Sequence, residues 1–201
     1  MLAQLSTVKA RLTIADLDTT SDTLLTNALK AVSARFDQEC NRTLARTENA
    51  VCEFDAVATE ICVPAYPIEA VTRWETKSSE SQGWLEQPAP EYIIRSGGVI
   101  SFARPFSLQP LALSLSRLTY TGGYVLPGAP DPQPLSPGAP PAWLPDDLEQ
   151  AAVEQVAWWF QNRDRQGLLR VWDYHATYRH FADQDLLTSV RAVLARYRRW
   201  A

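Results

Sequence analysis

The sequence has few of the residues that usually perform catalysis, bind metals or form membrane spans. Its 201 residues include only three cysteines, two histidines and one methionine. There is no run of 18 apolar residues, so we expect no membrane-spanning helix. Residues 1–6 lack the charged start and the apolar stretch of a secretory signal. The cysteines, Cys40, Cys52 and Cys62, are too sparse for a disulfide framework and are typical of a reducing compartment.

The spacing of the polar residues matches no catalytic or metal-binding pattern. The cysteines lie 12 and 10 residues apart without a Cys-x-x-Cys pair, which disfavours a zinc site. His175 and His180 are five residues apart, a poor spacing for one helical face. Asp16, Asp18 and Asp22 lack the glycine and the closing glutamate of a calcium loop, and helix capping explains them better.

The usual nucleophile and phosphate-binding motifs are also missing. There is no Gly-x-Ser-x-Gly elbow, and Gly122-Gly123 is not followed by a phosphate-loop lysine. We therefore predict that the protein is not an enzyme, holds no metal and needs no cofactor. A small hydrolase with an unrecognised site, supported mainly by His175 and His180, remains the weakest alternative.

The chain does have an ordinary globular composition with an uneven charge distribution. Apolar residues make up 46% and charged residues 21%, and the length suits one domain or one domain with an insertion. The net charge is −4, yet residues 163–201 hold eight arginines against four aspartates. A basic tail on an acidic body favours contact with an acidic partner or another copy; a solvated helix face is the alternative.

Hydrophobic periodicity predicts helices at both ends of the chain. Ser6 can cap a short helix, and a longer helix is predicted from Ser21 or Asp22 to about Asn41. Another helix is predicted over 146–162, capped by its first aspartate and with further acidic residues in its first turn. A final helix is predicted near the C-terminus.

These helices are expected to pack as a small bundle. The successive rings of Trp158, Trp159 and Phe160 point about 100° apart, so one stripe cannot bury all three. Their helix is therefore either central or shared between chains. The residues predicted to pack between helices are Leu25, Val32, Phe36, Val156, Trp158 and Trp159.

Between residues 43 and 125 the pattern changes to short alternating runs. Six strands are predicted, near 50–54, 60–63, 70–75, 92–95, 99–102 and 113–120. Gly97-Gly98 between two apolar runs predicts a hairpin. In the last run we expect Leu113, Leu115 and either Leu118 or Tyr120 to face inward, with one bulge absorbing the shift. We therefore expect these strands to form an antiparallel sheet or a small sandwich.

The fold class is thus α+β: a small helical bundle with an antiparallel β insertion and a C-terminal helical arm. The stretch 126–145 contains eight prolines and two glycines and cannot form a helix. The predicted parts are N-terminal helices of the bundle (1–42), the β insertion (43–125), a Pro-rich loop (126–145), a core helix (146–162) and a C-terminal arm and helix (163–201).

The arm is the candidate interaction segment. It is rich in aromatic residues and arginines, which protein interfaces favour, and has little core of its own. Packing of the arm on its own subunit is the alternative. The predicted interface residues are Arg170, Trp172, Tyr174, Tyr178, Phe181, Arg196, Arg198, Arg199 and Trp200.

Several stretches, taken in order, resemble a known family. They are residues 8–12 and the helix ending near 40–42, residues 67–71 leading into an aromatic strand, residues 118–124, residues 144–151 with 158–163, and the closing segment 189–198. In this order and spacing, over most of its length, the chain resembles the head–tail connector (adaptor) proteins of tailed bacteriophages.

The resemblance implies a structural virion protein at the head–tail junction. It implies a homo-oligomeric ring, usually of twelve copies, that binds the portal protein through the C-terminal segment. A stopper or tail-completion protein would bind the other end, and phage DNA would pass through the channel without sequence-specific binding. It implies no membrane and no catalysis, with assembly in the host cytoplasm.

Two further expectations belong with this resemblance. The acidity of the body fits a channel in which DNA slides, because carboxylates repel phosphate. A truncation after Asn162 is expected to leave a folded body without portal binding. The alternative function is a DNA-binding packaging accessory protein using Arg163, Arg165, Arg170, Arg179, Arg191, Arg196, Arg198 and Arg199.

Overall fold

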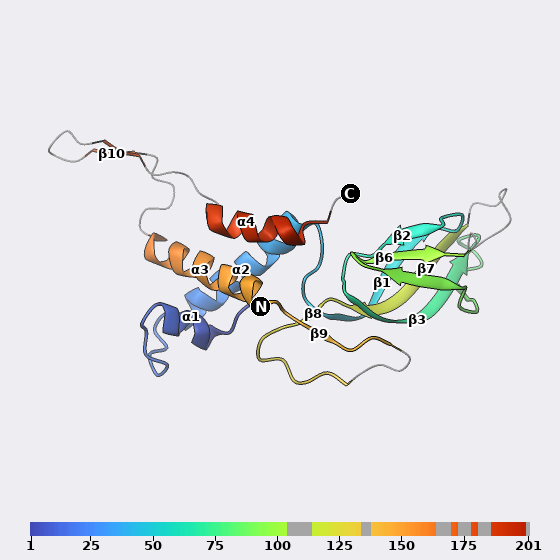
Figure 1. Cartoon of the computed structure of the whole chain (residues 1–201), viewed down its shortest axis with the longest axis horizontal. Helices are drawn as coiled ribbons and strands as arrows, with labels where there is room; N and C mark the ends of the chain where they lie inside the picture. The colour runs from blue at the N-terminus through green and yellow to red at the C-terminus, as the bar shows by residue number, and fades with distance from the viewer. Residues whose placement is uncertain (104–113, 134–137, 164–169, 173–177, 181–185, 200–201) are drawn as a thin grey trace. The chain divides into compact units, whose positions relative to one another are not determined.

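The structure, a computed structural model, combines α-helices and antiparallel sheets and so has the predicted α+β class. It describes residues 1–103, 114–133, 138–163, 170–172, 178–180 and 186–199 (Figure 1). The chain forms two compact units. The helical unit comprises 1–40 with 144–198, and the β unit comprises 41–143 with 199–201.

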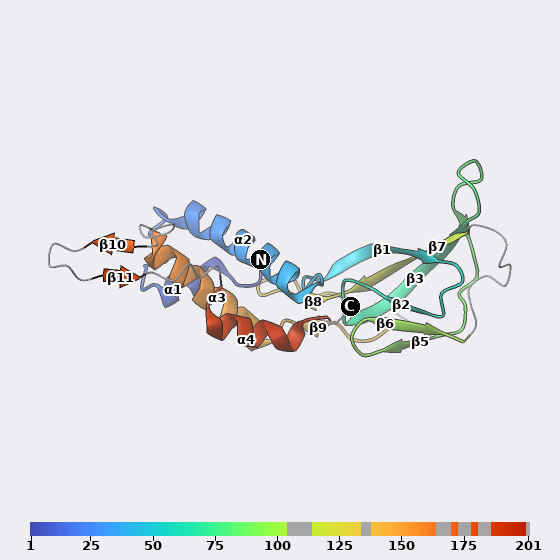
Figure 2. The ribbon, with the colours of Figure 1, turned by 90° about the horizontal axis from the view of Figure 1, so that it is seen from above.

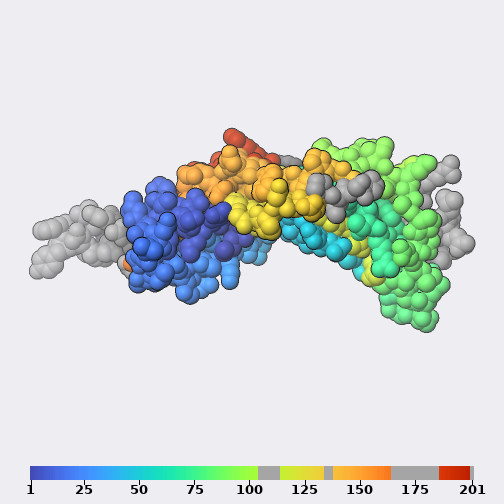
Figure 3. Space-filling view, turned by 90° about the horizontal axis from the view of Figure 1, so that it is seen from below, coloured from blue at the N-terminus to red at the C-terminus, as the bar shows by residue number. Residues whose placement is uncertain are grey.

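The helical unit is a bundle whose members come from both ends of the chain. Its helices are α1 (Leu5–Arg11), α2 (Asp22–Cys40), α3 (Asp146–Gln161) and α4 (Thr188–Tyr197). α3 contacts the other three helices, and Figure 3 shows the blue N-terminal helices packed against the orange residues of α3. Because α2 and α3 are far apart in sequence, the bundle closes only when both ends of the chain meet.

The helix boundaries differ in detail from the predictions. Ser6 and the first aspartate of α3 are not caps: Gln4 and Pro145 occupy the N-cap positions, without a capping side-chain hydrogen bond. α2 ends at Cys40 because Asn41 has a left-handed φ of 49°, which an asparagine tolerates better than most residues. In the described part of the chain, no helix is long and apolar enough to cross a membrane.

Two antiparallel sheets enclose the core of the β unit. The four-stranded sheet has the order β1-β7-β3-β4, and the three-stranded sheet has the order β2-β6-β5 (Figure 2). All pairings within them are antiparallel. The strands are β1 (Thr47–Asp55), β2 (Glu60–Cys62), β3 (Ile68–Lys77), β4 (Leu85–Glu86), β5 (Tyr92–Arg95), β6 (Val99–Phe102) and β7 (Leu115–Gly122).

Aromatic rings from both sheets fill the core of the β unit. The Phe102 ring lies 5.6 Å from the Trp74 ring in a T-shaped arrangement and 5.7 Å from the Phe54 ring in a stacked one. Phe102 comes from the three-stranded sheet and the other two from the four-stranded sheet. These ring contacts therefore join the two sheets, and such pairs add about 0.5–1.5 kcal/mol beyond their buried area.

The inward face of β7 differs from the prediction at its first residue. Leu118 and Tyr120 are fully buried, but Leu115 is 47% exposed, so its predicted inward orientation is wrong. β7 pairs with β1 without the expected bulge between Leu115 and Tyr120, so Leu115 faces outward with Arg117 and Thr119, while Ser116, Leu118 and Tyr120 face inward. Leu113 lies outside the described residues.

The hairpin predicted at Gly97-Gly98 is confirmed. β5 and β6 pair on either side of it, and both glycines have positive φ, which glycine adopts without a Cβ penalty. β4, which pairs with β3, was not predicted, and neither were two further strand pairs. β8 (Tyr124–Val125) pairs in parallel with β9 (Ala142–Trp143), at the end of the Pro-rich stretch, and β10 (Arg170–Trp172) pairs with β11 (Tyr178–His180) in the arm.

Candidate interaction surfaces

Three of the stretches that carry the family resemblance meet in one place in the β unit. We call residues 41–46, 64–70 and 120–124 together the motif junction. Thr43 N–H donates to the Pro64 carbonyl at 2.9 Å, and Tyr124 N–H donates to the Leu44 carbonyl at 2.8 Å. Gly123 N–H donates to the Pro67 carbonyl at 2.9 Å. Backbone hydrogen bonds therefore join segments that contain, or directly adjoin, three of the stretches that carry the resemblance.

The two glycines of the motif junction are required by close backbone packing. A Cβ on Gly122 would lie 2.6 Å from the Ala65 carbonyl oxygen. A Cβ on Gly123, whose φ is +102°, would lie 2.5 Å from the Ala45 carbonyl oxygen. No side chain fits at either distance, so Gly122-Gly123 serves the fold rather than phosphate binding.

Buried charges complete the motif junction. Glu69 is only 2% exposed, and both of its oxygens accept hydrogen bonds from Arg46, at 2.7 and 2.9 Å. This bidentate pairing with Glu69 raises the pKa of Arg46 above its usual value. The guanidinium of Arg42 lies 3.3 Å from the centre of the Tyr66 ring and donates to the Tyr66 carbonyl. Both arginines and Glu69 therefore have hydrogen-bond partners within the β unit.

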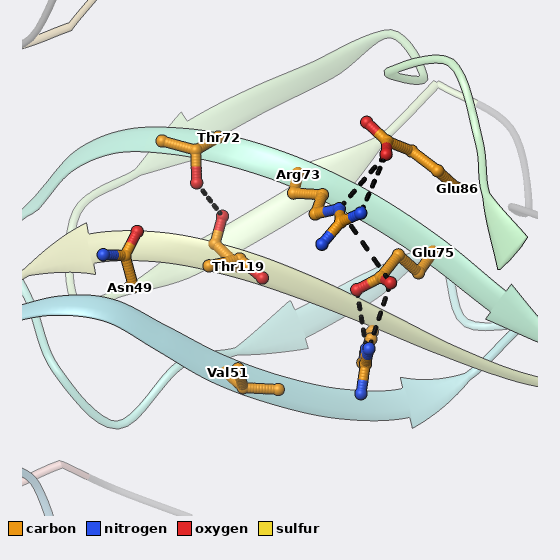
Figure 4. Close-up of a pocket in the computed structure, with 8 residues that line it drawn as sticks. Asn49, Val51, Thr72, Arg73, Glu75, Glu86 and Thr119 are labelled. Atoms are coloured by element: carbon orange, nitrogen blue, oxygen red, sulfur yellow. Dashed lines mark hydrogen bonds and ion pairs between the residues drawn. The ribbon is translucent and has the colours of Figure 1, made fainter. Parts of the chain in front are cut away.

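The outer face of the four-stranded sheet holds a second charged cluster, whose two arginines and two glutamates line an open pocket (Figure 4). Arg117 on β7 donates to both oxygens of Glu75 on β3, at 2.7 and 3.0 Å. Arg73 donates to Glu86 on β4 at 3.0 Å and lies 3.9 Å from Glu75. The ring centre of Trp84 lies 4.3 Å from the guanidinium of Arg117. We call these five residues the sheet-face cluster.

The ion pairs of the sheet-face cluster connect β3 to its two neighbouring strands, β4 and β7. The hydrogen bonds from Arg117 hold the pKa of Glu75 below its ordinary value, although burial opposes this shift. The same pairing raises the pKa of Arg117. Both groups are therefore charged at neutral pH, and neither is poised to exchange a proton near pH 7.

Neither cluster could be read from the sequence. The partners lie far apart in the chain, 23 residues for Arg46 and Glu69 and 42 residues for Arg117 and Glu75. The available signal was an isolated glutamate inside each strand-like run, where charge is disfavoured unless it is paired. In the part of the chain that the structure describes, no group of three His, Cys, Asp or Glu residues could hold a metal ion.

The predicted interface residues fall into three groups. Arg170, Trp172 and Tyr178 lie in the β10–β11 ladder. Arg196 and Arg198 are exposed at the end of α4, whereas Arg199 is half-buried and donates to the Val63 carbonyl at 3.3 Å. Tyr174, Phe181 and Trp200 lie outside the described residues.

α4 itself is part of the bundle rather than a separate arm. Val190 and Leu194 are buried, and the Tyr197 hydroxyl donates to Asp147 on α3 at 2.6 Å. Leu187 N–H donates to the side-chain oxygen of the fully buried Gln155 at 2.9 Å. A truncation after Asn162 would remove these contacts and expose the core, so the expected folded remnant conflicts with the structure.

The residues predicted to pack between helices differ in burial. Leu25, Val32 and Phe36 on α2 and Val156 on α3 are fully buried. Trp158 and Trp159 are only half-buried, and so is the neighbouring Phe160, whose ring centre lies 4.6 Å from the guanidinium of Arg163. The last turn of α3 thus presents aromatic and cationic groups where the chain leaves the bundle for the arm.

Comparison with known proteins supports the fold at low sequence identity. No family model and no curated protein sequence matches the chain. Solved structures match all of it. The chain aligns over 100% of its length, and over 91% of the matched chain, with "Neck of empty GTA particle computed with C6 symmetry", at 15% identity and a TM-score of 0.63.

Two further structures give the same result. "Neck of native GTA particle computed with C12 symmetry" matches at 15% identity and a TM-score of 0.56, covering 100% of this chain and 90% of the other. "Virion of native gene transfer agent (GTA) particle" matches at 14% identity and a TM-score of 0.57, covering 100% and 91%. The chain therefore has the fold of chains found in the necks and virions of gene transfer agent particles.

Proposed function

We propose that this protein is a structural component of a virion neck: a head–tail connector (adaptor) that forms a ring and joins the capsid to the tail. The observation that carries the proposal is the full-length match of its fold to chains in gene transfer agent necks. A match that spans both units supports a shared role better than a match to one unit alone. The C6 and C12 symmetries named for those necks favour a cyclic assembly.

The proposed partners follow from the resemblance to bacteriophage connectors. The ring, of about twelve copies, would bind the portal protein through its C-terminal segment, with a stopper or tail-completion protein at the other end. A cyclic ring needs two different patches on each copy that meet around the axis. The portal-binding patch is proposed to include the β10–β11 ladder and the exposed Arg196 and Arg198.

A non-enzymatic role is consistent with the chemistry of the described residues. Their buried carboxylates, Glu69 and Glu75, are both paired with arginines. Both oxygens of each carboxylate already accept hydrogen bonds from its arginine, which favours a structural role for these two groups. In the proposed ring, DNA would pass through the channel without base-specific contacts, since an acidic body does not retain phosphate.

The proposal is tested on purified particles. We expect the protein at the head–tail junction in electron microscopy, as a ring next to the portal. Particles from cells that lack the protein should have filled or empty heads without attached tails. A protein that is absent from purified particles would contradict the proposed function.

A packaging accessory that binds DNA is the second candidate. The exposed Arg191, Arg196 and Arg198 form no ion pair with another described residue, which leaves them available to phosphates. Binding of the isolated protein to duplex DNA, measured from low to moderate salt, distinguishes the two roles. A steep loss of affinity with salt favours the accessory role, whereas weak binding at all salt concentrations favours the connector.

A further inference from the structure

Each sheet of the β unit has one edge formed by its longer outermost strand. β1 is at an edge of the four-stranded sheet and pairs only with β7 among the described strands. β5 is at an edge of the three-stranded sheet and pairs only with β6 among them. Figure 2 shows these two strands along opposite borders of the β unit. Each edge therefore presents backbone N–H and C=O groups to a further strand.

β1 lacks the usual protection of an exposed strand edge. It has nine residues, none of them lysine or proline, and its pairing with β7 is regular from Ala50 to Asp55. None of the nine residues is buried, and Val51 is 53% exposed. Natural edge strands are usually short, bulged or interrupted by lysine or proline, because an open edge recruits another strand. β1 is therefore an edge that we expect a further strand to cover.

The side chains of β1 select the kind of strand that can pair there. Val51 and Glu53 lie two residues apart on the outer face, where Glu53 is opposite Arg117 of β7. The strand carries three carboxylates and no cation. Two copies of β1 side by side would repel each other, because neither supplies a positive charge. The strand that fits has an apolar residue and a cation on one face.

β5 carries this combination. Ile93 and Arg95 are two residues apart, so they share one face of the strand, and they are 67% and 60% exposed. The ion pair of Arg95 within the chain is weak, because Glu60 lies 3.7 Å away and is itself exposed. Ile94, on the opposite face, is 41% exposed. Arg95 can therefore turn to another carboxylate at little cost, and β5 offers apolar side chains on both faces.

One parallel register matches the two strands residue by residue. When Val51 lies beside Ile93, Glu53 lies beside Arg95 on the same face. This register joins two apolar side chains and two opposite charges, and both kinds of pair stabilise neighbouring strands. An antiparallel register that pairs Glu53 with Arg95 sets Asp55 beside Ile93 instead. The antiparallel register that pairs Val51 with Ile93 sets two glutamates side by side.

We propose that the β1 edge of one copy pairs in parallel with the β5 edge of a second copy, with Val51 beside Ile93 and Glu53 beside Arg95. This inference rests on the proposed neck function and deepens it, because it names the surface that joins neighbouring copies of the ring. A cyclic assembly needs two different patches on each copy. Two different edges on opposite borders of one unit meet this need, whereas pairing of like edges stops at two copies.

Exchanging the two charges tests the contact in the full-length protein. In cells that lack the wild-type protein, Glu53→Arg and Arg95→Glu should each lower the yield of tailed particles at least about tenfold, because each places like charges together. The double variant Glu53→Arg/Arg95→Glu should recover the yield to within about threefold of wild type. Normal yields from both single variants, or no recovery in the double variant, would overturn the proposal.

Two controls accompany the charge exchange. Asp131→Arg makes an equal change of charge at an exposed position of the Pro-rich loop and should leave the yield within about twofold of wild type. Because Glu53 also lies opposite Arg117 in its own sheet, the thermal unfolding of each variant is followed by circular dichroism. Where a charge variant unfolds at a lower temperature, cross-linking that keeps both charges decides the outcome.

Cysteine pairs test the register without changing a charge. Val51→Cys and Ile93→Cys are combined in a chain that also carries Cys52→Ala and Cys62→Ser, with Cys40 buried in the bundle. Residues beside each other on neighbouring strands are close enough for a disulfide. Mild oxidation of particles should therefore give covalent oligomers that a reductant separates, and either new cysteine alone should give none. Oligomers from one new cysteine alone would show that like edges pair, which overturns the proposal.

The same particles separate this contact from the proposed function. If the chain with both new cysteines enters necks normally and oxidation gives no covalent oligomers, the edge pairing is wrong and the neck function stands. If the wild-type protein is absent from purified particles, the neck function itself is contradicted.

Discussion

The helical unit and the β unit are held together by different kinds of contact. In the helical unit, the buried side chains are mainly apolar residues at helical spacing, with the fully buried Gln155 and one buried charge, Lys9, which pairs with Asp22 at 2.6 Å. The β unit buries three charged residues, Arg42, Glu69 and Glu75. Apolar packing tolerates small shifts, whereas a buried charge is costly unless its partner is in place. The periodicity of apolar residues thus specifies most of the bundle, whereas the β unit depends more on particular charged pairs.

This difference follows from how far apart in sequence the contacts lie. The apolar stripe of α2 is contained in 19 consecutive residues. The β1–β7 ladder instead pairs Cys52 with Leu118, across an intervening stretch that contains five other strands. Pairing of such distant strands needs additional contacts that select one register, because a slip of one residue exchanges the two faces. The ion pairs and the glycines of the motif junction supply that selection.

Replacing a core ring of the bundle should have the largest effect on stability. Phe36 is fully buried on α2, and Phe36→Ala removes a large apolar group without the space closing completely. We expect a loss of about 4 kcal/mol in the free energy of unfolding, measured by urea denaturation. Lys30→Ala, on the exposed side of the same helix, is the control and should change it by less than about 0.5 kcal/mol.

Replacing a glycine of the motif junction should have the second-largest effect on stability. Gly123→Ala places a Cβ within 2.5 Å of the Ala45 carbonyl oxygen at a φ of +102°. We expect a loss of about 3 kcal/mol. Gly97→Ala also has a left-handed φ, but nothing lies within 4 Å of its Cβ, so about 1 kcal/mol is expected. Similar losses for the two variants in thermal unfolding would contradict close packing at the motif junction.

The sheet-face cluster should contribute less, and its contribution should depend on pH. Glu75→Gln is expected to cost about 2 kcal/mol at pH 7, because it removes a charged partner of Arg117. The folded pKa of Glu75 is below its ordinary value of 4.5, so its stabilisation is complete above that value and disappears as the pH falls through the folded pKa. Unfolding curves of variant and wild type should therefore converge in acid.

The exposed glutamate of the same cluster is the matched control for that substitution. Glu86 is 65% exposed and pairs with the half-exposed Arg73. Glu86→Gln is expected to change the free energy of unfolding by less than about 0.5 kcal/mol, at pH 7 and in acid. A pH-independent difference between wild type and Glu75→Gln would show that the pairing with Arg117 does not control its effect.

Removing the ring of Trp158 should cost little stability for so large a side chain. Its side chain is half-buried, so Trp158→Ala is expected to cost about 1.5 kcal/mol rather than the larger loss of a buried tryptophan. If the exposed part of the ring contacts another protein in the proposed neck, incorporation into particles should fall much more than stability does. A loss near that of Phe36→Ala would place Trp158 in the core of the bundle instead.

The predictions from sequence succeeded where local pattern was sufficient. The positions of α2 and α3, the hairpin at Gly97-Gly98 and the buried Leu118 all follow from spacing and turn chemistry within short windows. The error at Leu115 came from assuming a bulge between Leu115 and Tyr120, because the observed pairing with β1 is regular there and puts residues 115 and 118 on opposite faces.

The C-terminal segment shows what residue types can predict and what they cannot. Residue types alone selected Arg170, Trp172 and Tyr178 as interface candidates. Only the structure shows the register of this segment, in which Arg170 lies opposite His180 and Arg179 opposite Val171. Likewise, the basic C-terminal sequence suggested an arm, but the buried contacts of α4 place that helix in the bundle.

By itself, the sequence determined the α+β class, the amphipathic faces of the long helices and the absence of familiar catalytic motifs, since all of these depend on residues close together in the chain. The tertiary structure decided which strands are neighbours, which arginine meets which glutamate and why Gly122-Gly123 is needed. The physical reason is that burial and ion pairing depend on distance in space, and one sequence pattern is compatible with many arrangements of distant segments until the chain has packed.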